Sequence, residues 1–285
     1  MAWRVGAIRK GLGRLVLACV LLLTSSAAPA QPPLQLGLFP YLPTTTLLAT
    51  YEPLRQHLSV QLGRPVEAST APNFLAFARR CLAGEYDLAV IGSGLGRYIE
   101  KEAAYLPLAV SRRDMQSLLA VSRDSNITGI AELKHARLAT IDPYTLMTQL
   151  GRALLRRGGL DPDRDIRFEF VSTPFNAAES VLLGEAQAAF ISTAALARLP
   201  ADKRAQFRIL AESPAIPGIV VYARQGAMLP PAEDLTALLV AFGNDSESGR
   251  RFVKEALLDG FKPPAPDEFE MNDTFLPEIR RLFAR

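Results

Sequence analysis

The stretch Ala136 to Asp161, ARLATIDPYTLMTQLGRALLRRGGLD, decides the fold. Its first residues are apolar enough for a buried strand, a polar turn follows at Asp142-Pro143-Tyr144-Thr145, and apolar residues then recur at helical spacing until Gly158-Gly159. A buried strand that runs directly into a helix is the unit of a parallel, helix-covered sheet. Asp142 or Thr145 can cap this helix and leave backbone N–H groups that attract anions and polar groups. The same turn can equally be an ordinary helix start, so the surrounding sequence decides between the two.

The same strand-to-helix unit recurs before and after this stretch, but its rhythm is interrupted twice. Two strand-like runs follow each other without a helix at Leu106 to Ser111 and Ser117 to Ser122, and again at Phe207 to Ala211 and Ile219 to Tyr222. Each interruption is typical of a crossover between two lobes. We therefore predict an α/β protein of two Rossmann-like lobes joined by two strand-like crossovers. In this prediction lobe 1 comprises residues 31–114 and 215–285, and lobe 2 comprises residues 115–214.

The first thirty residues have the layout of an export signal. Four basic residues precede the apolar run Leu15 to Leu23, and Ala28-Pro29-Ala30 forms an A-x-A cleavage site. An apolar run of this length is about half of what a bilayer requires, so we expect residues 1–30 to be cleaved rather than retained as an anchor. A lipoprotein signal at Cys19 is the alternative, but the apolar run continues past this cysteine. The exported chain is expected in the periplasm.

Export changes the charge and the cysteine count of the chain. The sequence holds 32 Lys and Arg and 29 Asp and Glu, and four of the basic residues lie in the expected signal, which leaves 28 basic against 29 acidic residues. This near-neutral balance gives no reason to expect a nucleic-acid partner. Cys81 is then the only cysteine, so no internal disulfide can form. No cluster of His, Cys, Asp or Glu has metal-ligand spacing, and we expect no metal, no cofactor and no catalytic residues.

A cleft between two such lobes is the usual place for a small ligand, because the loops at the carboxyl ends of the strands meet there. Four loops are expected to line it, and all are rich in hydroxyl, Gly or Tyr residues: Tyr41 to Thr45, Gly92 to Gly96, Asp142 to Thr145 and Ser172 to Asn176. From these loops we predict the ligand-binding residues Tyr41, Thr44, Gly92, Ser93, Tyr144, Thr145 and Thr173.

Several segments, in this order, resemble the phosphate, phosphite and phosphonate family of ABC-transporter periplasmic substrate-binding proteins. They are GLFPYLP near the start, LAGEYDLAVIG at Leu82 to Gly92, SLLAVSRDSNI followed by IAELKHARLATID, and LLGEAQAAF at Leu182 to Phe190. The resemblance covers nearly the whole exported chain and implies the two-lobed type II periplasmic-binding-protein fold. It places the chain as a divergent member of the family.

The resemblance also implies where a ligand is held. Tyr41 and the Gly92-Ser93 turn occupy the family's ligand-facing positions in lobe 1, and Thr145 occupies one in lobe 2. The family has a Ser/Thr-rich turn after Asp-Pro, whereas this chain has Tyr144 and Met147 there, and Thr173 is followed by Pro174-Phe175 where the family has a His-Asp pair. A buried charge that lacks partners is costly, so these departures favour a less charged, partly organic solute.

The resemblance implies a protein that performs no chemistry. We expect a monomer that captures a small anionic or polar organic solute, phosphonate-like, between its lobes and delivers it to an ABC permease in the inner membrane. Ligand binding would shift the equilibrium between open and closed lobes toward the closed form. Two alternatives stay open: a ligand-sensing module for a membrane receptor or sensor kinase, and a secreted enzyme on the same fold. The sequence leaves the identity of the solute open.

Overall fold

The computed structural model describes residues 31–284, and Pro33–Arg285 forms one compact unit. The predicted signal at residues 1–30 lies outside the described residues. Among the described residues, no helix is both long and apolar enough to span a bilayer.

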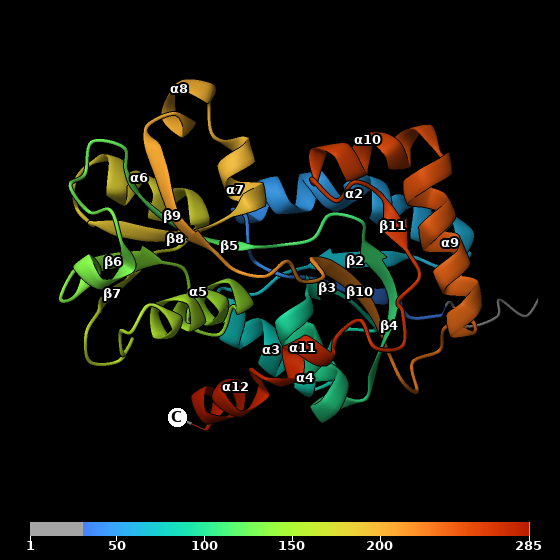
Figure 1. Ribbon diagram of the computed structural model, residues 1–285. Coiled ribbons are helices and arrows are strands. Elements are labelled where there is room, and N and C mark those ends of the chain that lie inside the picture. Colours follow the sequence, from blue (N-terminus) through green and yellow to red (C-terminus); the bar gives the residue numbers. More distant parts are fainter. Residues whose placement is uncertain (1–30, 285) are drawn as a thin grey trace, which may run out of the picture. The chain divides into compact units, whose positions relative to one another are not determined.

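Two sheets organise the molecule, and both are mixed (Figure 1). In the first sheet the strand order is β11-β4-β10-β3-β1-β2, where β3, β1 and β2 run parallel and β10 is antiparallel to β3 and β4. Its strands are β1 (Leu34–Leu38), β2 (Val66–Ser69), β3 (Leu88–Gly92), β4 (Tyr105–Ser111), β10 (Ile219–Arg224) and β11 (Phe261–Lys262). We call this sheet with its helices lobe 1.

The second sheet has the order β7-β6-β8-β5-β9, and we call it with its helices lobe 2. Strands β7, β6 and β8 are parallel, whereas β5 is antiparallel to β8 and β9. Its strands are β5 (Ser117–Ser122), β6 (Arg137–Thr140), β7 (Arg167–Phe170), β8 (Ala188–Ser192) and β9 (Phe207–Glu212). Figure 1 shows this sheet beside the first, with helices on both faces of each.

Helices cover both faces of the first sheet, as the apolar strands require. One face carries α2 (Thr44–Gln61), α9 (Ala232–Asp245) and α10 (Glu247–Glu255); the other carries α3 (Phe74–Leu82), α4 (Ser93–Ala103) and the C-terminal helices α11 (Glu270–Asp273) and α12 (Leu276–Phe283). The second sheet packs between α5 (Leu146–Arg157) on one face and α6 (Pro174–Leu182) with α7 (Thr193–Arg198) on the other. Short turns at η1 (Ile130–Leu133) and α8 (Ala201–Arg204) complete the elements.

The strands form where the apolar runs stand, because these residues are buried on both faces. In β3 the first four residues are buried, and β8 has the same pattern. The helices that follow start at side-chain caps: the Thr145 hydroxyl accepts the N–H of Thr148 at the start of α5, and Ser192 accepts the N–H of Ala195 at the start of α7. The strand and the helix predicted within Ala136 to Asp161 are thus β6 and α5.

The chain passes from lobe 1 to lobe 2 between β4 and β5, and returns between β9 and β10. The two connections pair with each other: the N–H of Met115 donates to the Ile216 carbonyl at 2.8 Å, and the N–H of Ile216 donates to the Met115 carbonyl at 3.0 Å. The predicted boundaries at residues 114 and 215 fall inside these connections, and as domain limits they stay a prediction.

Candidate functional site

A cavity of about 150 Å³ lies between the two sheets and is lined from both lobes. Lobe 1 contributes the loop after β1 with Phe39 and Tyr41, the start of α4, and the chain after β4 with Arg113. Lobe 2 contributes the starts of α5, α6 and α7. Most of these segments directly follow a strand, which is why the sheet edges bring them together.

Four helices begin at this cavity, and their first N–H groups make its surroundings electropositive. The caps of α5, α6 and α7 are Thr145, Thr173 and Ser192, and each accepts the N–H of the third helical residue. The supply of further N–H groups differs between them, because Pro174 at the start of α6 has no N–H and the N–H of Thr193 at the start of α7 donates to the Gln116 carbonyl. Helix α4 starts at Gly92 without any side-chain cap. Such helix ends favour negatively charged ligands.

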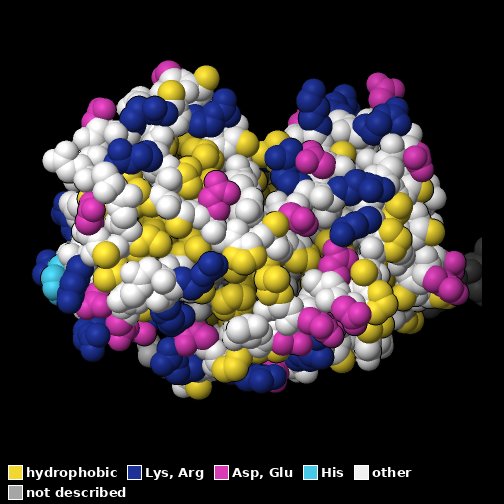
Figure 2. Space-filling view, viewed as in Figure 1, with side chains coloured by type: hydrophobic (Ala, Val, Ile, Leu, Met, Phe, Trp, Pro, Cys, Tyr) yellow, Lys and Arg dark blue, Asp and Glu magenta, His cyan; other side chains and the backbone are white. Residues whose placement is uncertain are grey.

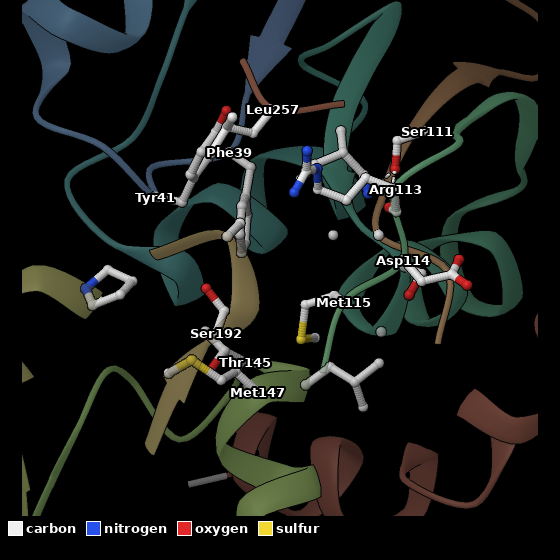
Figure 3. A pocket seen from close by; sticks show the side chains of 18 of the residues that line it. Phe39, Tyr41, Ser111, Arg113, Asp114, Met115, Thr145, Met147, Ser192 and Leu257 are labelled. Carbon is white, nitrogen blue, oxygen red and sulfur yellow. Dashed lines mark hydrogen bonds between the residues drawn. The ribbon is translucent and has the colours of Figure 1, made fainter. Parts of the chain in front are cut away.

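Arg113 supplies a cationic side chain to the lining. One of its terminal nitrogens donates to Asp259 at 2.8 Å, while its Nε is buried and has no hydrogen-bond partner among the described residues. Figure 3 shows the guanidinium turned inward over the cavity and the carboxylate of Asp114 turned away from it. Since a buried donor without a partner is costly, Arg113 is a natural anchor for an anion.

The remaining walls are apolar and polarisable. Phe39 and Tyr41 stack with their ring centroids 6.3 Å apart, and Met115 and Met147 present thioethers from the opposite side (Figure 3). The Tyr41 hydroxyl is paired with that of Tyr51 at 3.1 Å, and burial raises the pKa of Tyr41, so the phenol stays neutral at physiological pH. These walls suit an organic group rather than a second charge.

Ser93 is fixed rather than free. Its hydroxyl donates to the Pro217 carbonyl at 2.5 Å and its N–H donates to the Gly218 carbonyl at 2.9 Å, which ties α4 to the return connection. The hydroxyl oxygen keeps only its acceptor capacity, so Ser93 can receive a hydrogen bond from a ligand but has no further proton to donate.

The predicted site residues divide into two groups. The structure brings Tyr41, Gly92, Ser93 and Thr145 together at the cavity. It places three others elsewhere. Thr44 is exposed in the first turn of α2, Thr173 caps α6 beside the lining residue Pro174, and Tyr144 donates its hydroxyl to the Leu282 carbonyl at 3.0 Å, away from the lining. A ligand-binding role of each of the seven residues stays a prediction.

Sequence reasoning missed Arg113, which stands in a polar turn between two strand-like runs and looks like a linker residue. The signal that marks it is its place just after the carboxyl end of β4, where cleft residues gather in such folds. Leu257 was also missed, because it follows α10 far along the chain and enters the lining only through tertiary packing. Within residues 31–284, no group of three or more His, Cys, Asp or Glu side chains could hold a metal ion.

The chain matches the family model described as "ABC transporter, phosphonate, periplasmic substrate-binding protein" over residues 36–269. No curated protein sequence matches it. Among solved structures, a binding-protein component of a phosphonate ABC transporter from Pseudomonas aeruginosa superposes with a TM-score of 0.74 at 19% identity, covering 89% of each chain.

A second similar structure is PhnD1 from Prochlorococcus marinus in complex with methylphosphonate, with a TM-score of 0.73 at 15% identity over 88% of this chain and 98% of the other. A third is XAC2383 from Xanthomonas citri bound to chloride, with a TM-score of 0.71 at 21% identity over 87% of this chain and 99% of the other. At these identities the structures show the fold, which confirms the predicted two-lobed periplasmic binding architecture. The family match confirms the resemblance drawn from the sequence and does not favour a sensor or an enzyme. The chain belongs to the family of periplasmic substrate-binding proteins of phosphonate ABC transporters.

Proposed function

We propose that this protein captures a small organic anion, with one charged head and a short apolar substituent, in the cavity between its lobes. It acts as an exported monomer that presents the ligand to an ABC permease and carries out no chemistry itself. Family membership supports the small-molecule ligand, the permease partner and the periplasmic location. The chemistry of the cavity supports the class of ligand.

The observation that carries this ligand class is the Arg113 guanidinium, with its buried and unpartnered Nε, in a cavity where four helices begin. A guanidinium and the helix N-termini both favour an anionic head group. The Asp114 carboxylate points away (Figure 3), and no other acidic residue lines the cavity among residues 31–284, so an ammonium group would lack an acidic partner there.

The size and walls of the cavity limit the rest of the ligand. A cavity of about 150 Å³ is large enough for a benzene-sized molecule. The aromatic and thioether walls favour an alkyl or similar apolar group over a second charge. A phosphonate or sulfonate with a short substituent meets these requirements better than inorganic phosphate, which has no apolar part.

The test is a thermal-shift and calorimetric screen of the parent protein with methylphosphonate, propane-1-sulfonate and inorganic phosphate. A ligand at a hundred times its Kd stabilises the fold by about 2.7 kcal/mol, so an organic anion that binds raises the unfolding temperature. Because hydrogen bonds to a charged group contribute about 1.5–3 kcal/mol, Arg113→Met should weaken binding by about 10- to 100-fold.

Arg112→Met is the matched control, since Arg112 is exposed and does not belong to the cavity lining. It should bind as the parent does. Failure of organic anions to stabilise the parent, or unchanged binding in Arg113→Met, contradicts the proposed ligand class.

A further inference from the structure

One hydrogen bond joins the two lobes directly at the rim of the cavity. The guanidinium of Arg198, the last residue of α7 in lobe 2, donates through Nη2 to the carbonyl oxygen of Glu255, the last residue of α10 in lobe 1, at 2.6 Å. We call this contact the Arg198–Glu255 bridge. Figure 2 shows a hollow on this face between the parts of the surface that hold α7 and α10 in Figure 1.

The acceptor of the bridge is a carbonyl at a helix C-terminus. The carbonyls at positions 252–254 of α10 accept the N–H groups of residues 256–258, whereas the Glu255 carbonyl accepts the guanidinium from the other lobe. The C-terminal end of a helix is electronegative, so a cation is favoured there. The bridge is therefore an electrostatically matched contact as well as a hydrogen bond.

The Glu255 end of the bridge continues directly into the cavity wall, and helix α7 connects the Arg198 end to it. The residues just after Glu255, at 256–258, line the cavity from lobe 1, and Leu257 among them has a left-handed backbone with φ of 56°. Helix α7 starts at the cavity with Ser192 and Ala194 and ends at Arg198. A change in the distance between the lobes must therefore alter the bridge and the cavity together.

The charge of Arg198 also acts on lobe 1 beyond the Glu255 carbonyl. Burial raises the pKa of Tyr41, and the nearby positive charge of Arg198 opposes part of this rise, as it does for Tyr51. The charge of Arg198 is therefore felt at the Tyr41–Tyr51 hydroxyl pair beside the aromatic wall of the cavity.

We propose that Arg198 is a positioning residue that holds the two lobes together at the cavity mouth and so slows release of the ligand. The role of Arg198 in ligand release rests on the ligand capture proposed above, whereas the contact between the lobes does not require a ligand. One hydrogen bond of this kind corresponds to a change of up to about tenfold in the ratio of closed to open molecules.

The experiment measures the distance between the lobes by pulsed electron paramagnetic resonance. Spin labels are attached at Asp202→Cys in lobe 2 and Ser248→Cys in lobe 1, both exposed positions, while the buried Cys81 stays unlabelled. The parent, Arg198→Met, Arg198→Lys and Arg204→Met are compared, each without ligand and with propane-1-sulfonate. Arg204 is the matched control because it donates to the Ala197 carbonyl of its own lobe.

We expect the ratio of short-distance to long-distance molecules to be up to about tenfold lower in Arg198→Met than in the parent, with an unchanged unfolding temperature. Arg198→Lys should restore part of this population, and Arg204→Met should resemble the parent. A distance distribution in Arg198→Met that equals the parent's overturns the role of Arg198. The distances are also measured without ligand. An effect of Arg198→Met on the ligand-free distances would therefore support the bridge even if no organic anion binds the parent.

Discussion

At the scale of single residues, Asp142 and Asp163 have opposite electrostatic environments, although they stand just before and just after the same helix, α5. Burial raises the pKa of Asp142, and the N–H of Tyr144, which donates to its carboxylate at 2.8 Å, offsets only part of the rise. Asp163 is the reverse case: the Arg152 guanidinium donates to it at 2.6 Å and lowers its pKa. The two residues should therefore respond to pH with opposite sign.

A folded-state pKa above the unfolded value means that protonated Asp142 stabilises the fold. This stabilisation is complete below the unfolded pKa of about 3.9 and is lost as the pH rises through the folded value. At pH near 7 the ionised carboxylate thus opposes folding. Asp142→Asn keeps the acceptor for Tyr144 and should raise the free energy of unfolding by about 0.5 kcal/mol at that pH, with no gain near pH 3.

Asp163→Asn should do the opposite. Its lowered pKa stabilises the fold above the unfolded pKa, and this contribution disappears as the pH falls through the folded value. Since Asp163 is largely exposed while Arg152 is buried, the loss at neutral pH should be about 1 kcal/mol. Urea titrations at several pH values give the free energy of unfolding of both variants. If it changes with pH in the same direction in both, relative to the parent, the predicted opposite signs are wrong.

Residue-level features of this kind could be predicted only where the chemistry is local. The sequence predicts that Asp142 or Thr145 caps the helix, and the structure shows that Thr145 does. Tyr144 could not be placed, because its partner, the Leu282 carbonyl, stands 138 residues away in the C-terminal helix. The role of Arg113 at the cavity likewise depends on how two lobes meet, which residue types in a turn do not encode.

At the scale of elements, α4 of lobe 1 approaches α5 of lobe 2 over a glycine. A Cβ atom at Gly94 would lie 2.6 Å from the Cβ of Leu146, closer than side chains tolerate. The clash would be between the two lobes rather than within one. Gly151 in α5 is a contrasting case, because a Cβ there would lie 2.5 Å from the Phe190 ring inside lobe 2.

We expect Gly94→Ala to separate the lobes at the cavity and weaken binding of an organic anion by at least tenfold, with little change in stability. Gly151→Ala should instead destabilise the fold by about 1–3 kcal/mol, since it overpacks a buried core. Calorimetric titration with propane-1-sulfonate and urea unfolding measure the two effects. If the Gly94→Ala variant binds the anion as tightly as the parent, the close approach of α4 and α5 is not required for ligand binding.

The elements themselves were largely accessible from the sequence. Apolar runs predict β4, β5, β6, β9 and β10, and helical spacing predicts α5, because period and burial leave a direct trace in the residue pattern. Strand β11 could not be predicted, since it has two residues and exists only through pairing with β4.

At the scale of the whole molecule, one apolar cluster includes buried residues of both sheets, among them Ile91 of lobe 1 and Phe190 of lobe 2. Helix α12 contributes Ile279 to this cluster, and its Phe283 stacks on Tyr98 of α4 and meets Tyr144 edge-on. The C-terminal helix thus connects lobe 1 to the turn before α5. The two lobes should therefore unfold together.

We expect Ile279→Ala to lower the free energy of unfolding by about 2–5 kcal/mol in a single transition, because the residue is fully buried. Hydrogen exchange of the β3 and β8 amides during a urea titration should give one midpoint for both lobes. Arg281→Ala, an exposed change on the same helix, is the control and should stay within about 0.5 kcal/mol of the parent. Separate midpoints for β3 and β8 would refute a shared core.

The two-lobed organisation was predictable because consecutive strands without an intervening helix occur twice in the chain. What holds the lobes together was not, since Arg198 pairs with Glu255 and Tyr144 with Leu282 across long stretches of sequence. Such contacts form only when the two folded lobes lie against each other, so no local pattern in the sequence predicts them.

The two connections between the lobes are bonded to each other at Met115 and Ile216. An antiparallel bridge of this kind resists sliding of one connection past the other, because sliding stretches both hydrogen bonds, whereas bending across the bridge leaves them intact. We therefore expect the lobes to open by a hinge-like rotation at Met115 and Ile216 rather than by a slide. A single distance chosen across that hinge should then report most of the motion.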